Sequence, residues 1–282
     1  MKVRLLAPLA FAALMAGNLA LAQEVKKATA AKSIPVLYST DLHHPHVDPD
    51  DHFDLATLFA IPEFDIRGIV LDCGERQLKQ PGKIPLEQMM HLTKRRVPYE
   101  IGLARPLKAT DNEGRSQPPE FQKGVEMILD VLRKSPEKVT IVTAGSLRDV
   151  AAALNRDAKL FQWKVARLYI NIGDAAVRKD YNVDLDVHSW VRIMRSGLPV
   201  YWCACGDGGD WTRGCGYSTW WQFRQRDFLL KVPPPLQNYF AYALARIGSV
   251  DPLAYLSRHL SPKELDFAFI RCHQRISRLR LV

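Results

Sequence analysis

The chain lacks the sequence features that define several common classes of protein. It has no basic helix, zinc-finger spacing or aromatic stacking motif, so we expect no nucleic-acid partner, and its formal charge of +9 indicates a solvated basic surface. It has no Gly-x-Ser-x-Gly elbow, since the sequence after Ser146 lacks the closing glycine, and this argues against a serine hydrolase built on that motif. The glycine-rich residues 206–210 contain two aspartates and no lysine, which argues against a phosphate-binding loop there.

Long apolar runs are also scarce, and the main one lies near the start of the chain. Lys2 and Arg4 precede an apolar segment at residues 5–16, and small residues at 20–22 form a cleavage pattern. Positive, apolar and small-residue regions in this order are typical of a secretory signal peptide. A membrane anchor is the alternative, but the apolar segment is short and is broken by proline, glycine and asparagine.

The chain therefore divides into three expected parts. These are a signal peptide at residues 1–22, a polar tether at residues 23–33 and one domain at residues 34–282. No stretch after the signal peptide is long and apolar enough to span a bilayer. We therefore expect a periplasmic or secreted protein with no membrane contact after cleavage.

Cysteine is sparse and its count is odd. The five cysteines are Cys73, Cys203, Cys205, Cys215 and Cys272. An odd count in an exported chain implies at least one unpaired thiol. An oxidising compartment would permit a disulfide from Cys203 or Cys205 to Cys215, and a metal cluster of these three is the alternative.

Short apolar runs alternate with helical periodicity along the rest of the chain. Buried strands are predicted at residues 35–38, 66–71, 139–143, 165–172 and 200–203, and amphipathic helices at residues 125–132, 147–154 and 187–194. This alternation predicts an α/β domain around a mostly parallel sheet flanked by helices. Ligands of such sheets bind beyond the carboxyl ends of the strands. From about residue 211 onward we expect mainly helices that cap the sheet.

The loop after the first predicted strand is rich in aspartate. Asp41, Asp48, Asp50 and Asp51 fall within eleven residues, and carboxylates this close repel one another unless a counter-charge is present. A hard divalent cation such as calcium supplies that charge and takes several oxygen ligands. The alternative is an acidic helix N-cap, which explains Asp48 and Asp50 but not Asp41 at the strand end.

The same loop carries a family resemblance. Thr40-Asp41 at a strand end, followed by residues 48–51 (DPDD) at a helix start, resembles the opening motif of the inosine-uridine preferring nucleoside hydrolase family. Further similar stretches follow in the family's order at residues 139–154, 169–173, 181–186 and 250–254. The resemblance implies a nucleoside hydrolase-like α/β fold in a single domain.

The resemblance implies a calcium site. The ligands would be the carboxylates of Asp41, Asp51 and Asp251 and the backbone carbonyl of Arg148. Waters and substrate hydroxyl groups would complete the coordination shell, because calcium takes six to eight oxygens.

The resemblance also implies where the sugar binds. Asp50 and Asn182 would contact ribose hydroxyl groups. Residues 72–75 stand where the family has a glycine-asparagine pair, which makes Glu75 a third candidate for contact with the sugar. The partner would be a small nucleoside or sugar, and analogy with the family suggests a homo-oligomer.

The implied reaction is hydrolysis of the N-glycosidic bond of a ribonucleoside or related riboside. Calcium would lower the pKa of a bound water, and Asp41 would take the proton of that water as general base. The sugar would pass through an oxocarbenium-like state, stabilised by the nearby carboxylates.

One departure from the family pattern concerns the leaving group. Val250 stands where the family has a histidine before the late aspartate, and valine cannot donate a proton. His43, His44 and His46 in the acidic loop are the candidates to replace it as acid, since histidine titrates near neutral pH. They are otherwise solvent-facing loop residues or ligands of a transition metal such as zinc.

Two further functions remain open on the sequence. The chain could be a non-catalytic, calcium-containing protein that binds sugars or nucleosides, which Val250 favours, whereas the retained base Asp41 favours the hydrolase. It could also be a glycosidase that uses the same metal to bind the vicinal hydroxyl groups of another carbohydrate.

Overall fold

The computed structural model describes residues 33–176, 180–206, 219–271 and 276–280. The expected signal peptide and all of the expected tether except Ser33 lie outside the described residues. Cys215 and Cys272 also lie outside them, so the disulfide to Cys215 stays a prediction. None of the helices in the described ranges combines the length and apolar character that crossing a membrane requires.

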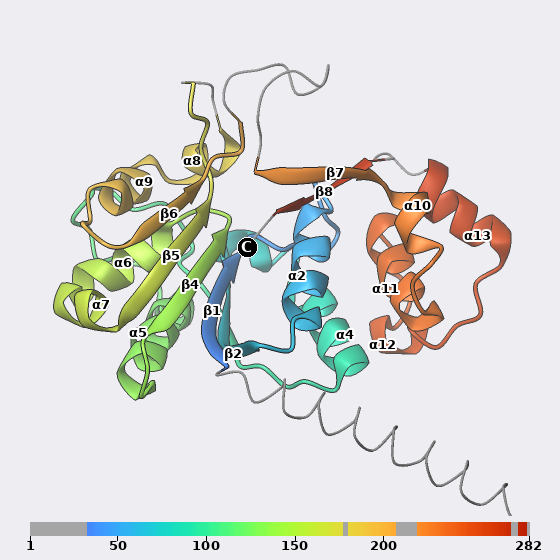
Figure 1. The fold of residues 1–282 in the computed structure, drawn as a ribbon, viewed down its shortest axis with the longest axis horizontal. Coiled ribbons are helices and arrows are strands. Elements are labelled where there is room, and N and C mark those ends of the chain that lie inside the picture. The colour runs from blue at the N-terminus through green and yellow to red at the C-terminus, as the bar shows by residue number, and fades with distance from the viewer. Residues whose placement is uncertain (1–32, 177–179, 207–218, 272–275, 281–282) are drawn as a thin grey trace, which may run out of the picture.

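A parallel sheet forms the centre of the fold (Figure 1). Its six strands lie in the order β3-β2-β1-β4-β5-β6, and each neighbouring pair is parallel. The strands are β1 (Ile34–Thr40), β2 (Phe64–Leu71), β3 (Tyr99–Ile101), β4 (Val139–Ala144), β5 (Val165–Asn171) and β6 (Val200–Cys203). Five of them lie where the apolar runs predict strands, but β6 is not buried as predicted, because Tyr201 and Trp202 are 46% and 40% exposed. The sixth, β3, has three half-buried residues and therefore no such run.

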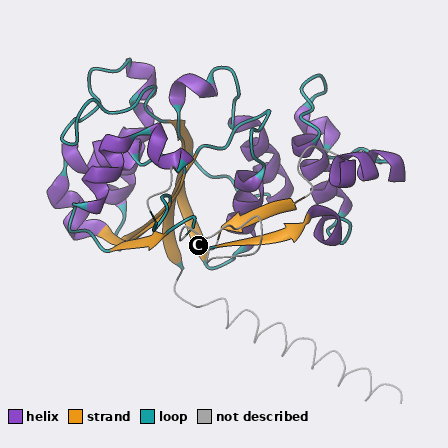
Figure 2. Ribbon diagram, turned by 90° about the horizontal axis from the view of Figure 1, so that it is seen from above, coloured by secondary structure: helices purple, strands orange, loops and turns teal. Residues whose placement is uncertain are grey.

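Helices cover both faces of this sheet, as the view from above shows (Figure 2). One face carries α2 (Asp50–Ala60) and α4 (Lys83–Thr93). The opposite face carries α5 (Lys123–Lys134), α6 (Arg148–Arg156), α7 (Ala158–Lys164) and α9 (Val187–Met194). Shorter turns in the loops are α3 (Gly74–Gln77), η1 (Pro119–Phe121) and α8 (Tyr181–Leu185). The three predicted helices are confirmed as α5, α6 and α9, but the apolar face predicted for α9 is wrong, because Val187 and Met194 are 51% and 42% exposed.

Two hydrophobic cores result from the alternation of side chains along the strands. In β1, Val36 and Tyr38 join the core shared with α2 and α4, whereas Leu37 between them joins the core shared with α5 and α6. The single-domain α/β fold with a central parallel sheet, expected from the sequence, is therefore confirmed.

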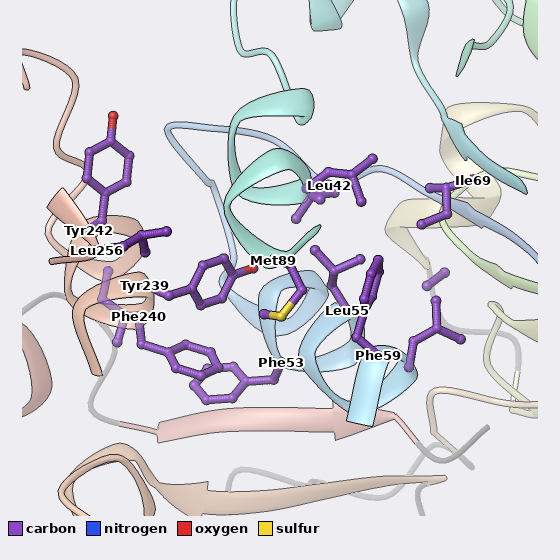
Figure 3. Packing of buried hydrophobic residues seen from close by; sticks show 14 of the residues in the cluster. Leu42, Phe53, Leu55, Phe59, Ile69, Met89, Tyr239, Phe240, Tyr242 and Leu256 are labelled. Atoms are coloured by element: carbon purple, nitrogen blue, oxygen red, sulfur yellow. The ribbon is translucent and has the colours of Figure 1, made fainter. Parts of the chain in front are cut away.

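The C-terminal part of the chain packs on α2 and α4. Its elements are β7 (Trp220–Arg224), α10 (Gln225–Leu229), α11 (Pro234–Leu244), α12 (Pro252–Tyr255), α13 (Pro262–Asp266), the π-helix η3 (Phe267–Arg271) and β8 (Ile276–Arg280), with β7 and β8 antiparallel. Phe240 of α11 stacks on Phe53 of α2 with ring centroids 4.4 Å apart (Figure 3). This part is mainly helical, as expected, but it covers the helices α2 and α4 instead of capping the sheet directly, and the β7–β8 pair was not predicted.

Candidate functional site

A cavity of about 280 Å³ opens beyond the carboxyl ends of β1 and β5. Its lining is dominated by carboxylates and contains Asp41, His43, Val47, Asp48, Asp50, Asp51, Arg76, Asp180, Tyr181, Asn182 and Cys205. A larger surface cavity of about 600 Å³ lies beside α5 and contains none of the residues that the sequence singles out. The acidic cavity is therefore the candidate site, at the edge of the sheet where a parallel α/β fold binds ligands.

Backbone pairing at the end of β1 positions the first carboxylate. The amide of Asp41 donates to the carbonyl of Ala144 at 3.2 Å, and the amide of Asp72 donates to the carbonyl of Thr40 at 2.8 Å. The hydroxyl of Thr40 donates to Oδ1 of Asp51 at 2.7 Å, which ties the start of α2 to the strand end. Asp41, Asp50 and Asp51 are buried in the lining of one cavity, with 9%, 5% and 7% of their surface exposed.

Gly145 gives these carboxylates room. A Cβ atom at this position would lie 2.9 Å from the amide nitrogen of Asp41 and 3.1 Å from its Oδ1. The same atom would lie 3.1 Å from Oδ2 of Asp72. The turn after β4 therefore requires glycine for steric reasons, because any side chain would displace the backbone of Asp41.

The donors in the cavity suit a hard divalent cation. Asp41, Asp50 and Asp51 offer carboxylate oxygens, and the lack of a side chain at Gly145 leaves Oδ1 of Asp41 uncovered on that side. Calcium is held by oxygen donors of this kind and completes its shell with water. Among the described residues, no three histidine, cysteine or acidic side chains already converge on one point as a metal site. The residues present fit the chemistry of such an ion, with ligands still to be supplied by solvent and substrate.

Two of the predicted site residues lie elsewhere. Asp251 caps α12, where its Oδ1 accepts a hydrogen bond from the amide of Ala254 at 2.6 Å, and it is exposed and absent from the cavity lining. Glu75 is exposed and lines a neighbouring cavity, with its Oε2 3.5 Å from Nε of Arg105. The positions of both segments depend on packing against distant parts of the chain, and this packing cannot be predicted from the local sequence.

Arg148 starts α6, and its side chain forms a buried network beneath the cavity. Its Nε lies 3.4 Å from Oδ1 of Asp72, and its Nη2 donates to the carbonyl of Leu185 at 3.0 Å. Burial opposes the charge of Arg148, but the surrounding carboxylates, led by Asp72, outweigh it and raise the pKa of the guanidinium. Oδ2 of Asp72 also accepts from the amide of Ser146 at 2.7 Å, so the pair joins the loops after β2 and β4. The family resemblance implies only a backbone role for Arg148 and does not predict this ion pair.

The three candidate histidines separate in the structure. Only His43 lines the cavity. His44 stacks on Tyr242 with centroids 4.8 Å apart, and its Nε2 lies 2.6 Å from the carbonyl oxygen of Ile247. His46 packs edge-on against His52, with centroids 5.7 Å apart. Burial, aided by a nearby arginine in each case, lowers the pKa of His43 and of His46 to about 4, so both are neutral at pH 7.

The hydrogen bonds around His43 define its tautomer. Oε1 of Gln77 accepts from the amide of Gly82 at 2.7 Å, and its Nε2 donates to the carbonyls of Leu42 at 3.1 Å and Asp72 at 2.9 Å. Nδ1 of His43 lies 3.2 Å from Nε2 of Gln77 and 3.3 Å from the carbonyl oxygen of Gln80, and a proton on Nδ1 lets it donate to that carbonyl. The buried Nε2 of His43 then carries a lone pair and accepts a proton, which is the property of a base.

The opposite wall of the cavity is formed by α8 and α3. Asp180 caps α8 by accepting from the amide of Val183 at 3.0 Å, and this turn places Asn182, which is 5% exposed, in the lining. Nη1 of Arg76 donates to the hydroxyl oxygen of Tyr181 at 2.8 Å. The sequence predicted Asn182 but not Arg76, because a bond between residues 105 positions apart has no local signal.

The parallel sheet with an acid-lined cavity at its carboxyl edge defines an α/β protein with a carboxylate-based ligand site. The family model described as inosine-uridine preferring nucleoside hydrolase matches residues 38–238. The chain therefore belongs to this family, as the resemblance at residues 40–51 indicated.

The similarity of the chain to individual members of known sequence or structure is low. The chain is 28% identical over 189 residues to the pyrimidine-specific ribonucleoside hydrolase RihA of Citrobacter koseri, a match that covers 60% of this chain and 59% of that protein. Its structure is similar to the plant nucleoside hydrolase PpNRh1, with a TM-score of 0.54 and 15% identity over 83% of this chain and 79% of the other. It is also similar to the effector protein XOO4466, with a TM-score of 0.51 and 18% identity over 93% and 82% of the two chains. At these identities the two structures support the fold alone.

Proposed function

We propose that this protein hydrolyses the N-glycosidic bond of ribonucleosides or related ribosides with the help of a bound calcium ion. The observation that carries the proposal is the burial of Asp41, Asp50 and Asp51 in one cavity that also contains Asn182. Membership of the nucleoside hydrolase family supports the reaction class. The match spans 59% of the length of the RihA relative, so the activity of this chain is a proposal.

Each cavity residue has a role in the proposed reaction. Asp41 takes the proton of the attacking water, whose oxygen forms a bond to the anomeric carbon. Asp50 and Asn182 orient the sugar through its hydroxyl groups, and Asp51 holds the cation together with Asp41. When bound, calcium supplies a lowered pKa for the attacking water. The bond from carbon to nitrogen breaks, and its electron pair departs with the base, which gains a proton.

The departing base must gain a proton, and the structure limits which residue can donate it. Val250 does not line the cavity, and its neutral side chain donates no proton. Of the three candidate histidines only His43 is placed to reach a substrate, and at neutral pH its Nε2 is an acceptor. We propose that His43 receives the proton that Asp41 takes from the attacking water and passes it to the leaving group, so that it acts as a relay.

A non-catalytic binding protein is the second candidate. The observation that favours it is the position of Asp251, whose carboxylate caps α12 and does not line the cavity. Such a protein would bind calcium and a riboside without turnover, because its cation site has fewer carboxylate ligands than the family resemblance implies.

One experiment separates these functions. Purified protein is incubated with a panel of purine and pyrimidine nucleosides, and the release of reducing sugar is measured with calcium and after addition of a chelator. Calcium binding is measured in parallel by titration calorimetry, with Asp41→Asn as the site variant. Chelator-sensitive turnover that Asp41→Asn abolishes supports the hydrolase. Calcium and nucleoside binding without sugar release from any nucleoside contradicts it and selects the binding protein.

A further inference from the structure

The most apolar side of α9 is turned away from the core of the domain. Val187, Trp190 and Met194 lie on one side of this helix, because residues three and four positions apart share a face. Val187 and Met194 are 51% and 42% exposed, and Trp190 is half-buried. The helix is anchored instead by Ser189 and Ile193, which are both fully buried. Its apolar side is therefore at the surface, whereas an amphipathic helix normally buries that side.

The neighbouring strand β6 extends this apolar surface. β6 is the last strand of the central sheet, so one of its edges has no neighbouring strand within the part of the chain that the structure describes. Trp202 of β6 is 40% exposed, and its ring centroid lies 5.8 Å from that of Trp190. Figure 1 shows α9 and β6 at the end of the sheet away from α11 and α13. We call this surface the α9 face, and its residues are Val187, Trp190, Met194 and Trp202.

Charged residues of opposite sign stand at the two ends of the α9 face. Asp184 in α8 is exposed and precedes the first residue of α9 by three positions. Arg195 is also exposed and is the residue at which α9 ends. The helix has eight residues, so its two ends are about 12 Å apart. The acidic end and the basic end make this surface complementary in charge to a second copy of itself that runs in the opposite direction.

We propose that the α9 face is the interface of a symmetric dimer of this chain, in which the two α9 helices lie antiparallel across a two-fold axis. Such an axis presents the same residues from both sides, so the surface must be complementary to itself. Val187 of one protomer packs against the partner's Met194, and the two Trp190 rings lie close to the axis. At each end, Asp184 of one protomer faces the partner's Arg195.

The charges select a second copy of the chain as the occupant of this surface. An apolar face of this kind suits many partners, but a partner of unrelated sequence has no reason to carry a base and an acid with the spacing of Asp184 and Arg195. A stable dimer buries about 800 Å² on each protomer, which is more than one short helix offers. The contact therefore includes Trp202 and the open edge of β6 beside the helix.

Sedimentation equilibrium of the purified protein over a range of concentrations tests the proposal. We expect the wild type to form dimers. In Val187→Glu and Met194→Glu the new charge enters the symmetric contact twice, so the dissociation constant should rise by about 100-fold, which is two losses of about 10-fold. Leu253→Glu is the matched control, because Leu253 is 41% exposed on α12, and it should leave the constant unchanged. A wild type that stays monomeric, or dimers that persist in both α9 variants, overturns the proposal.

Exchange of the two charges tests the antiparallel arrangement. Asp184→Arg and Arg195→Asp each place like charges opposite one another, and each should weaken the dimer by about 3- to 10-fold, the range for exposed pairs. The double variant restores opposite charges at both ends, so its dissociation constant should return to that of the wild type. Circular dichroism shows whether each single variant is folded. A double variant that associates no more tightly than the two single variants overturns the antiparallel dimer.

Discussion

Replacement of Arg148 by methionine removes the cation from the buried network beneath the cavity. The side chain of Arg148 is 4% exposed and that of Asp72 is fully buried, with 3.4 Å between Nε and Oδ1. Methionine fills a similar volume with no charge, so the carboxylate of Asp72 loses its counter-ion while two backbone amides still donate to it. The variant therefore leaves a buried charge uncompensated, and it also removes the donors to the carbonyls of Ala104 and Leu185.

The magnitude follows from the burial of this pair. Loss of one partner of a buried ion pair costs about 3–5 kcal/mol of unfolding free energy. For a domain of this size each kcal/mol lowers the melting temperature by roughly 2–4 °C, so Arg148→Met should melt roughly 6–20 °C below the wild type. The exposed pair of Arg105 and Glu75 provides a contrast, because its side chains are 74% and 60% exposed. Arg105→Met should change the free energy of unfolding by about 0–1 kcal/mol.

Urea denaturation followed by circular dichroism measures both variants. The double variant Asp72→Asn with Arg148→Met should be more stable than Arg148→Met alone, because asparagine carries no charge that needs a partner. With Asp72→Asn alone measured as well, the three variants complete a double-mutant cycle that gives the coupling energy between the two residues. A loss below about 1 kcal/mol in Arg148→Met, or a double variant no more stable than the single one, would refute the reasoning from buried charge.

Three further predictions concern the cavity, the core and pH. Gly145→Ala should weaken calcium binding measured by calorimetry, because its Cβ would lie 2.9 Å from the amide of Asp41. Gly248→Ala is the control and should not change the affinity, since nothing lies within 4 Å of that position. Equal calcium affinities of the two variants would contradict the steric argument. Phe240→Ala should lower the free energy of unfolding, measured in urea, by about 3–5 kcal/mol. Phe267 is 55% exposed, so Phe267→Ala should have a much smaller effect. Similar losses of stability in the two variants would contradict the assigned core. Burial, aided by nearby Arg246, lowers the pKa of His46 from 6.5 to about 4. As the pH falls from 6.5 to about 4, the unfolded chain is therefore protonated at this residue while the folded chain is not, so the free energy of unfolding should decrease. The decrease should be smaller in His46→Gln, and an equal decrease in the two proteins would contradict this prediction.

The sequence predicts most of the fold because its signals are local. The apolar runs of β1, β2, β4, β5 and β6 and the helical spacing in α5, α6 and α9 are each contained within one element. The strand β3 has three half-buried residues and no comparable run. The packing of α11 on α2 was not predictable, because the contact of Phe53 with Phe240 joins residues far apart in the chain.

The same distinction explains how much of the site could be predicted. Asp41, Asp50 and Asp51 lie within eleven residues, and a strand end followed by a helix start brings them together without help from distant segments. Asp251 was assigned by resemblance alone, and its position depends on how the C-terminal helices pack against α4. Arg76 lines the cavity and is bonded to Tyr181, so its place there becomes visible only in three dimensions.

The helix α2 connects the cavity to the C-terminal part of the chain. Its first turn carries Asp50 and Asp51 in the acidic cavity, while Phe53, one turn later, lies in the core against Phe240 of α11. A helix shifts as a rigid unit, so a change in the packing of α11 displaces the two carboxylates by a similar amount. On the proposed function, substitutions on α11 should therefore change the affinity for calcium without altering any residue that lines the cavity.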